Sequence, residues 1–140
     1  MQEETPLLLR RLVDKGYKVL LETNGTLDIG QLDKRCVKIL DVKCPSSGEA
    51  DRNDLSNLAK LSRVDEIKFV IRDRPDYAYA KNMMGREKTS LSKVKAVHFS
   101  PVFGKLAPRI LASWILEDRL NVRLQLQLHK LIWDPQQRGV

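Results

Sequence analysis

Short apolar-rich runs recur along the chain and are separated by longer segments with a different spacing of apolar residues. The runs cover residues 19–21, 37–43, 66–71, 96–102 and 122–128. Runs of this length and composition are typical of strands in a parallel sheet that has helices packed on it. We therefore predict five strands at these positions.

The intervening segments carry helix signals. Thr5 is a possible N-cap before Pro6, and Gly16 is placed to end a first helix. Further helices are predicted from Asp51 or Asn53, from Pro75 to Gly85, and from Pro108. Strands that mostly recur every 20 to 30 residues, about the length of a βαβ unit, indicate an α/β protein. We expect one domain over residues 1–140, with a parallel sheet of about five strands and flanking helices, doubly wound or part of a barrel.

Polar residues gather where the predicted strands end. In parallel sheets these carboxyl ends share one edge, and ligands bind there in open α/β sheets and in barrels. The sequence therefore predicts a binding site at this edge. Its polar residues are Glu22, Thr23, Asn24, Lys43, Cys44, Ser46, Arg72, Ser100, His129 and Lys130.

The fifth predicted strand has two unlike faces. Apolar residues occupy one face, and Arg123, Gln125, Gln127 and His129 occupy the other. The polar face lies along a wet edge or lines a cavity, and the alternation favours neither. Trp133 follows the strand, and we expect its ring to cover the apolar end of the barrel.

Composition narrows the classes of function. The chain of 140 residues has a net charge of +7 and a sequence pI near 9.6, with scattered basic residues. This balance favours an anionic small-molecule substrate over direct nucleic-acid binding. No apolar run approaches the roughly 18 residues of a membrane span, and the acidic start does not resemble a signal peptide. We expect a cytoplasmic protein without membrane contact.

Familiar catalytic and metal motifs are absent from the sequence. It has no Gly-rich phosphate loop, GxSxG elbow or HExxH motif. The two cysteines, Cys36 and Cys44, and the two histidines, His98 and His129, lack the spacing of metal ligands. We predict no metal site within this chain.

An ordered set of segments carries a family resemblance. They are residues 21–26 (LETNGT), 41–48 (DVKCPSSG), 65–71 (DEIKFVI), 99–102 (FSPV), 126–133 (LQLHKLIW) and 138–140 (RGV). Each segment alone is weak, but together they cover nearly the whole chain. The set resembles the 7-carboxy-7-deazaguanine synthases, radical S-adenosylmethionine enzymes of queuosine and deazapurine biosynthesis.

This resemblance implies a partial (β/α) barrel of the radical S-adenosylmethionine type, a homodimer and carbon–nitrogen lyase chemistry. The reaction would contract the ring of 6-carboxy-5,6,7,8-tetrahydropterin to 7-carboxy-7-deazaguanine with loss of ammonia. In the family, a [4Fe–4S] cluster reductively cleaves S-adenosylmethionine, the deoxyadenosyl radical abstracts a substrate hydrogen, and Mg²⁺ assists.

Site residues are carried over by motif, and none is assigned as catalytic. Thr23, His129 and the terminal carboxylate of Val140 would contact the pterin substrate, with Glu22 close by. The S-adenosylmethionine site would consist of Gly25, Cys44, Pro45, Ser46, Ser100, Pro101, Val102 and Phe103.

The chain departs from the family pattern in one respect. The CxxxCxxC-type cluster loop and the Gly-Gly-Glu-Pro motif do not occur in it. Two cysteines far apart cannot supply three ligands from one loop. We therefore expect a carboxyl-terminal part of the enzyme that is inactive alone. The alternative is a non-catalytic pterin- or nucleotide-binding α/β module.

Overall fold

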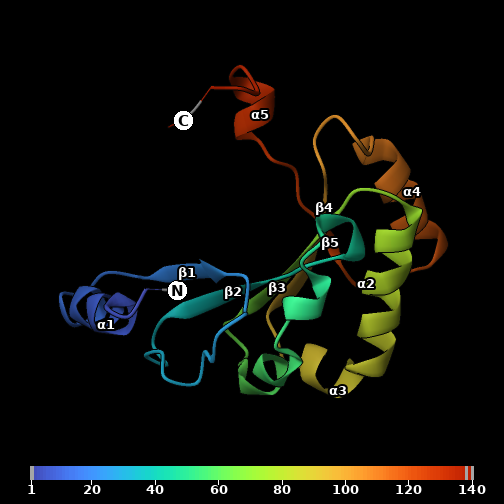
Figure 1. Ribbon diagram of the computed structural model, residues 1–140. Coiled ribbons are helices and arrows are strands. Elements are labelled where there is room, and N and C mark those ends of the chain that lie inside the picture. Colours follow the sequence, from blue (N-terminus) through green and yellow to red (C-terminus); the bar gives the residue numbers. More distant parts are fainter. Residues whose placement is uncertain (1, 138, 140) are drawn as a thin grey trace.

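Five parallel strands form a single sheet in the computed structural model, which describes residues 2–137 and residue 139 (Figure 1). The strand order is β1-β2-β3-β4-β5, and every neighbouring pair is parallel. The predicted α/β sheet is confirmed, and it is open and not closed into a barrel. The strands are β1 (Leu20–Thr23), β2 (Val37–Val42), β3 (Glu66–Ile71), β4 (Ala96–Pro101) and β5 (Arg123–Leu124).

Helices and 3₁₀ turns connect most of the strands. Asp73 caps α2, since its carboxylate accepts a hydrogen bond from Asp76 N, and a proline lies in the first turn. The α-helices are α1 (Thr5–Asp14), α2 (Arg74–Arg86), α3 (Lys88–Leu91), α4 (Pro108–Glu117) and α5 (His129–Ile132). The 3₁₀ helices are η1 (Pro45–Ser47), η2 (Ala50–Arg52) and η3 (Leu55–Lys60). None of these helices in the described part of the chain is long and apolar enough to span a membrane.

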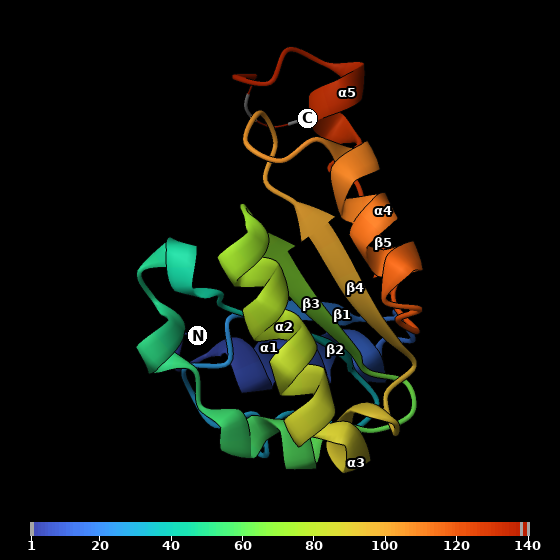
Figure 2. The same cartoon turned by 90° about the vertical axis from the view of Figure 1, so that its right-hand side faces the viewer.

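The sequential strand order explains why one face of the sheet is covered. Crossovers between parallel strands are nearly always right-handed, so strands that follow one another in chain order place their connections on the same face. Figure 2 shows α2 in front of the sheet, with α3 below the lower ends of the strands. The Tyr77 ring of α2 lies 5.9 Å from the Phe99 ring of β4 and 5.3 Å from the Trp114 ring of α4. These aromatic contacts fasten both helices to the covered face.

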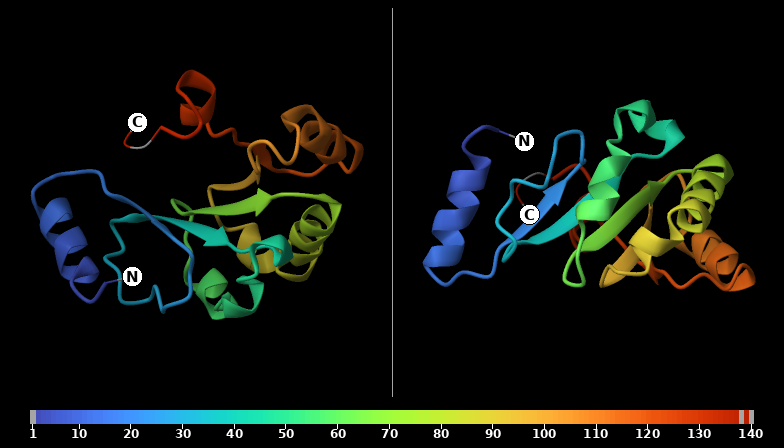
Figure 3. Two further views of the ribbon diagram at one scale, coloured as in Figure 1. Left: turned by 45° about the horizontal axis from the view of Figure 1, so that its top comes forward. Right: turned by 90° about the horizontal axis from the view of Figure 1, so that it is seen from below.

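The other face of the sheet carries polar side chains. Burial alternates along β2 and β3, where Leu40, Ile67 and Phe69 point to the helices and are buried. We call the opposite side the open face. Its residues are Glu22, Ile39, Asp41, Glu66, Lys68, Val70, His98 and Ser100. Figure 3 shows α1 at the β1 end of the sheet and α4 at the opposite end.

The last strand is much shorter than predicted. β5 contains only Arg123 and Leu124, and Gln125 N adds one further bond to Phe99 O at 2.9 Å. The chain then leaves the sheet and forms α5, so the predicted strand face over residues 122–128 is wrong. Trp133 is 45% exposed, and its expected burial is wrong for the described part of the chain.

The segment between β2 and β3 also differs from its prediction. It contains three 3₁₀ helices instead of one α-helix, and Asp54 caps the last of them through Ser56 N. Near the start of this segment, Pro45 and Gly48, which has a left-handed conformation (φ +71°), prevent a continuous α-helix. Asn57 binds the backbone of another loop, which favours short turns over a regular α-helix. Gly85 lies inside α2, which continues to Arg86, and does not end it.

Candidate functional site

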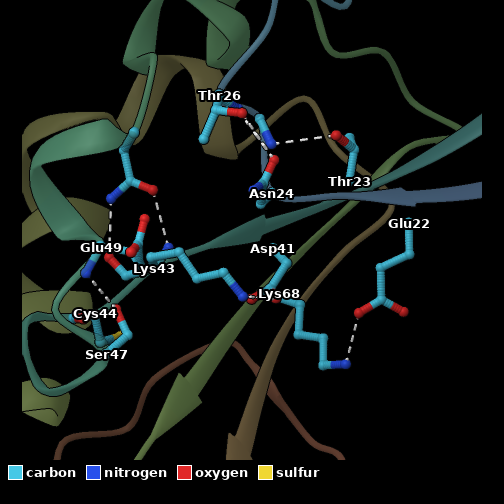
Figure 4. Close-up of polar contacts among 12 residues, drawn as sticks. Glu22, Thr23, Asn24, Thr26, Asp41, Lys43, Cys44, Ser47, Glu49 and Lys68 are labelled. Carbon is cyan, nitrogen blue, oxygen red and sulfur yellow. Dashed lines mark hydrogen bonds and ion pairs between the residues drawn. The ribbon is translucent and has the colours of Figure 1, made fainter. Parts of the chain in front are cut away.

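The turn after β1 forms the first part of the predicted binding edge, where the carboxyl ends of the strands meet (Figure 4). Thr23 Oγ1 accepts a hydrogen bond from Gly25 N at 3.2 Å, and Asn24 Oδ1 accepts from Thr26 N at 3.3 Å. Gly25 has φ +65°, a conformation that glycine adopts without steric cost. The Thr23 hydroxyl keeps its own hydrogen, which it can donate to a ligand.

A buried amide fixes this turn. Asn57 Nδ2 donates to Gly25 O and to Leu27 O, both at 3.0 Å, and Ile29 N donates to Asn57 Oδ1 at 3.1 Å. Asn57 is fully buried, so these bonds are shielded from water. Sequence reasoning missed this residue, although a lone amide among the apolar residues of η3 was a signal.

Cys44 follows β2, where its side chain was expected to line the cofactor site, but the side chain points elsewhere. Its side chain is only 2% exposed, in the core. Burial, with a smaller effect of the Asp76 charge, raises the pKa of the Cys44 thiol to about 12. The thiol is therefore neutral near pH 7, and only the Cys44 backbone is available to line a site. The carbonyl of Cys44 already accepts from Ser47 N at 3.0 Å and from Ser47 Oγ at 2.6 Å.

Asp76 ties the ends of β2 and β3 together. Its carboxylate accepts from Ser46 N at 2.9 Å, from Ser46 Oγ at 2.5 Å and from Arg72 N at 2.9 Å. Asp76 is fully buried, and its position in the first turn of α2 points it at both loops. This positioning residue was also missed from sequence, where it reads as an ordinary acidic residue of a first helical turn.

Charged groups of both signs lie on the open face. Lys68 Nζ contacts Glu22 Oε1 at 2.8 Å, and Lys43 Nζ contacts Asp41 Oδ2 at 2.6 Å. Asp41, Lys68 and His98 are register partners across β2, β3 and β4. This row places a carboxylate, an ammonium and an imidazole side by side.

The Glu66 carboxylate organises the neighbouring row of the open face. It accepts from Lys95 Nζ at 2.9 Å and pairs with His98 Nε2 at 2.9 Å. The hydrogen bond from Lys95, with a smaller contribution from His98, holds the pKa of Glu66 below its ordinary value. Glu66 is therefore a stable anion at neutral pH that orients the His98 ring.

Three buried polar atoms have no hydrogen-bond partner among the described residues: Asp41 Oδ1, Ser100 Oγ and Gln127 Oε1. Buried polar atoms are nearly always paired, because an unpaired one loses its bond to water. Asp41 and Ser100 belong to the open face, and Gln127 follows β5. Each of the three atoms is therefore a buried group whose hydrogen-bonding capacity is unused among the described residues.

A cavity of about 460 Å³ lies beyond the end of β4. Pro101 and Phe103 form part of its wall, with Leu106, Leu126 and Gln127. Val102 N donates to Ile71 O at 2.8 Å and so extends the β3–β4 pairing to the cavity. Lys130 Nζ lies 5.7 Å from the centre of the Phe103 ring.

Curated proteins that share one name match this chain over nearly its whole length. The chain is 45% identical to the 7-carboxy-7-deazaguanine synthase of Koribacter versatilis, over 99% of its own length, and 44% identical to that of Chlorobaculum tepidum, over all of it. It is 38% identical to the protein of that name from Methanospirillum hungatei, over 96% of its length. This chain is a relative of the 7-carboxy-7-deazaguanine synthases. No protein-family model matches it.

The chain spans only part of these synthases. It covers 66% of the Koribacter protein, 64% of the Chlorobaculum protein and 54% of the Methanospirillum protein. The activity, substrates and partners of a whole 7-carboxy-7-deazaguanine synthase are therefore proposals for this chain.

Most residues that the synthase resemblance singles out lie at the carboxyl edge of the sheet. Thr23 and Gly25 follow or end β1, Pro45 and Ser46 follow β2, and residues 100–103 end and follow β4. His129 is separated from this group, because it is the exposed first residue of α5 and does not end a strand. Val140 lies outside the described residues.

The described residues do not bring together the ligands of an iron–sulfur cluster. They contain no group of three or more His, Cys, Asp or Glu side chains that could hold a metal ion. Cys36 and Cys44, the two cysteines of the chain, are both buried. An iron–sulfur cluster needs cysteine thiolates at one place. The described residues therefore supply no set of cysteines for a cluster and no group of three side-chain ligands for a metal ion.

Proposed function

We propose that this chain forms the substrate- and nucleoside-binding part of a 7-carboxy-7-deazaguanine synthase. The overall reaction would be the radical ring contraction of 6-carboxy-5,6,7,8-tetrahydropterin to 7-carboxy-7-deazaguanine with loss of ammonia. The observation that carries the proposal is the similarity to these synthases over the whole chain. The meeting of three of the resemblance segments, residues 21–26, 41–48 and 99–102, at one sheet edge supports it.

The open face suits a pterin substrate. A pterin ring presents hydrogen-bond donors and acceptors along its edges, and the substrate carries a carboxylate. Thr23 would bind the ring edge through its hydroxyl hydrogen, and Asp41 Oδ1 would accept from a ring N–H. Lys68 lies beside Glu22 at 2.8 Å and would attract the substrate carboxylate. We also propose that His129, the exposed first residue of α5, contacts the substrate, as the resemblance implies.

The S-adenosylmethionine site would use the adjoining turns. Gly25 allows a close backbone approach, and Ser46 is held in place by Asp76. The unpartnered Ser100 hydroxyl would bind the cofactor at the end of β4. When bound and reductively cleaved, this cofactor supplies the radical that abstracts a hydrogen atom from the substrate.

The iron–sulfur cluster and Mg²⁺ would need ligands beyond those that the described residues bring together. This chain's own contribution would be binding, orientation and exclusion of water. A binding module without radical chemistry is the competing function, and the same lack of cluster ligands favours it.

We expect the 140-residue chain to release no 5′-deoxyadenosine from S-adenosylmethionine after anaerobic reconstitution with iron, sulfide and dithionite. The reason is that two buried cysteines cannot hold a [4Fe–4S] cluster. Iron content, visible absorption and chromatography of the products measure the outcome. A full-length 7-carboxy-7-deazaguanine synthase, reconstituted in parallel, is the positive control.

Two outcomes of this experiment are informative about the proposal. A stable four-iron cluster with 5′-deoxyadenosine formation would contradict the assignment of the cluster to residues outside this sequence. The second outcome is that the chain binds the pterin but S-adenosylmethionine is not cleaved, even after the cluster-bearing part of a related synthase is added. This result would favour the non-catalytic module.

A further inference from the structure

A groove of about 450 Å³ lies where the end of α2 and α3 meet the start of β4, away from the carboxyl edge of the sheet (Figure 2). We call it the α2–α3 groove. Its apolar lining consists of Met84, Leu91, Val97 and Leu120. Leu91 and Val97 belong to the hydrophobic core, and the other two are partly buried against it. The groove therefore presents an apolar surface that continues the core and that the described residues leave uncovered.

Gly85 keeps the α2–α3 groove open. It lines the groove from inside α2, where glycine destabilises a helix relative to alanine. A Cβ atom built on Gly85 would meet nothing within 4 Å, and its φ is not positive. Neither a neighbouring atom nor the backbone conformation therefore requires glycine here. The space that a side chain would fill is left available to a group from another molecule.

The rim of the α2–α3 groove carries unpaired positive charge. Lys88 lines the groove and is exposed. Lys81 also lines it and contacts Asp118 Oδ1 at 2.6 Å. The salt bridges among the described residues do not include Lys88. The Lys88 ammonium is therefore available to a carboxylate of another molecule.

A smaller cavity of about 180 Å³ extends the α2–α3 groove along the start of β4. Lys95 and Arg123 line this extension, and Arg123 is exposed and makes no salt bridge among the described residues. Neither cavity has an Asp or Glu among its described lining residues. The two cavities share four lining residues, which are Leu91, Ser92, Val97 and Asn121.

The combination of an apolar floor with a basic rim favours a peptide over a nucleic acid. A short acidic peptide supplies carboxylates and an apolar side chain from one segment, and acidic motifs are commonly bound by basic clusters. Single-stranded nucleic acids bind basic grooves in which aromatic side chains stack on the bases. Neither cavity has an aromatic residue among its described lining residues.

We propose that the α2–α3 groove docks an acidic peptide segment of a partner protein. An apolar side chain of the peptide lies on the floor beside Gly85, and its carboxylates pair with Lys88 and Arg123. A partner docked here leaves the carboxyl edge of the sheet free, so partner and substrate can be bound together. The inference does not depend on the proposed function.

Fluorescence anisotropy of a labelled hexapeptide, Glu-Glu-Leu-Phe-Glu-Glu, tests the proposal with the 140-residue chain. One comparison peptide has Ser-Ser in place of Leu-Phe, and the other has Gln in place of every Glu. We expect each comparison peptide to bind roughly 10-fold more weakly or worse, because each loses either the apolar anchor or the charge.

Two variants locate the binding. Gly85→Leu fills the groove and should weaken binding by roughly 10-fold or more, while the melting temperature stays equal or rises, since leucine favours a helix more than glycine does. Lys88→Glu places a like charge beside the peptide and should weaken binding by roughly 5-fold or more. The control is Lys18→Glu, which makes the same change in net charge before β1, at the other end of the strand order. It should leave binding within about 2-fold.

The other outcomes contradict the proposal in different ways. Absence of saturable binding of the acidic apolar peptide overturns it. Equal weakening by Lys88→Glu and Lys18→Glu would show attraction to the net charge without a defined site. A labelled RNA of about 12 nucleotides that binds, and that is weakened by Lys88→Glu but not by Gly85→Leu, would assign the surface to nucleic acid. The proposed function stands in each case, because the groove is not part of the carboxyl edge.

Discussion

Asp76→Ala is expected to lower the free energy of unfolding by about 3–5 kcal/mol, because hydrogen bonds to a charged group contribute about 1.5–3 kcal/mol each and their buried donors lose their acceptor. The carboxylate accepts from two backbone N–H groups and from the Ser46 hydroxyl, at 2.5 to 2.9 Å. Alanine leaves these donors buried and unpaired, and it releases the turn after β2 from the turn after β3. Chemical denaturation followed by circular dichroism measures the change.

A second carboxylate provides the control for Asp76. Asp51 is exposed in η2, and Asp51→Ala is expected to change stability by less than about 0.5 kcal/mol. Asp76→Asn tests whether both carboxylate oxygens of Asp76 are needed as hydrogen-bond acceptors. An amide nitrogen cannot accept from Ser46 or Arg72, so we expect asparagine to remain clearly destabilising. If Asp76→Ala unfolds at the same denaturant concentration as Asp51→Ala, the bonds around Asp76 do not hold the two turns.

Gly25→Ala is expected to cost about 2–4 kcal/mol of stability, since strain and overlap combine there. A residue with a side chain adopts φ +65° only at a cost, and a Cβ atom built on Gly25 would approach Leu40 Cδ1 closer than any real contact. Leu40 is only 3% exposed, so its side chain has little space to move away. The turn must shift, and binding at the carboxyl edge should weaken with it. Denaturation and ligand titration measure the two effects.

A substitution at Gly48 separates the cost of backbone strain from the cost of overlap with Leu40. Gly48 has φ +71°, yet a Cβ atom there meets nothing within 4 Å. Gly48→Ala therefore reports the strain alone, which we expect to cost about 1–2 kcal/mol. In a double variant, Leu40→Ala removes the overlapping atoms, so the cost of Gly25→Ala should fall to the Gly48→Ala value. Equal costs for the two glycines in the unaltered background would contradict the close approach to Leu40.

The apolar pattern predicted strand bounds correctly where a strand pairs with its neighbours along its whole length. β3 has the predicted bounds, because its alternation of apolar and charged residues matches one covered and one open face. The pattern in residues 122–128 alternates just as clearly, but the structure pairs only its first part with β4. Alternation describes one segment of chain and says nothing about how far a neighbouring strand extends.

Buried polar residues were the main features that the sequence did not predict. Asn57, Asp65 and Asp76 are fully buried, and each bonds to backbone of a segment 27 to 32 residues away in the chain. In sequence such residues read as solvent-exposed, since their partners become neighbours only after folding. The unpartnered oxygens of Asp41 and Gln127 were hidden for the same reason.

The candidate site was predictable at the level of strand ends. The predicted edge residues Thr23 and Ser46 lie in turns at the carboxyl ends of β1 and β2. Side-chain direction was not predictable, as Cys44 shows by pointing into the core although its neighbours lie at the edge. The position of His129 depended on the length of β5 and moved with it into α5.

The central claim is that this chain binds the pterin of a 7-carboxy-7-deazaguanine synthase on the open face of its sheet. Nitrogen-15 NMR of the chain during titration with 6-carboxytetrahydropterin tests it most directly. We expect the amide signals of Thr23, Gly25, Asp41 and Lys68 to shift with one saturating curve. Signals of Ala80 and Leu111, on the covered side, should stay in place. Absence of any saturable shift, or shifts confined to α2 and α4, would contradict the account.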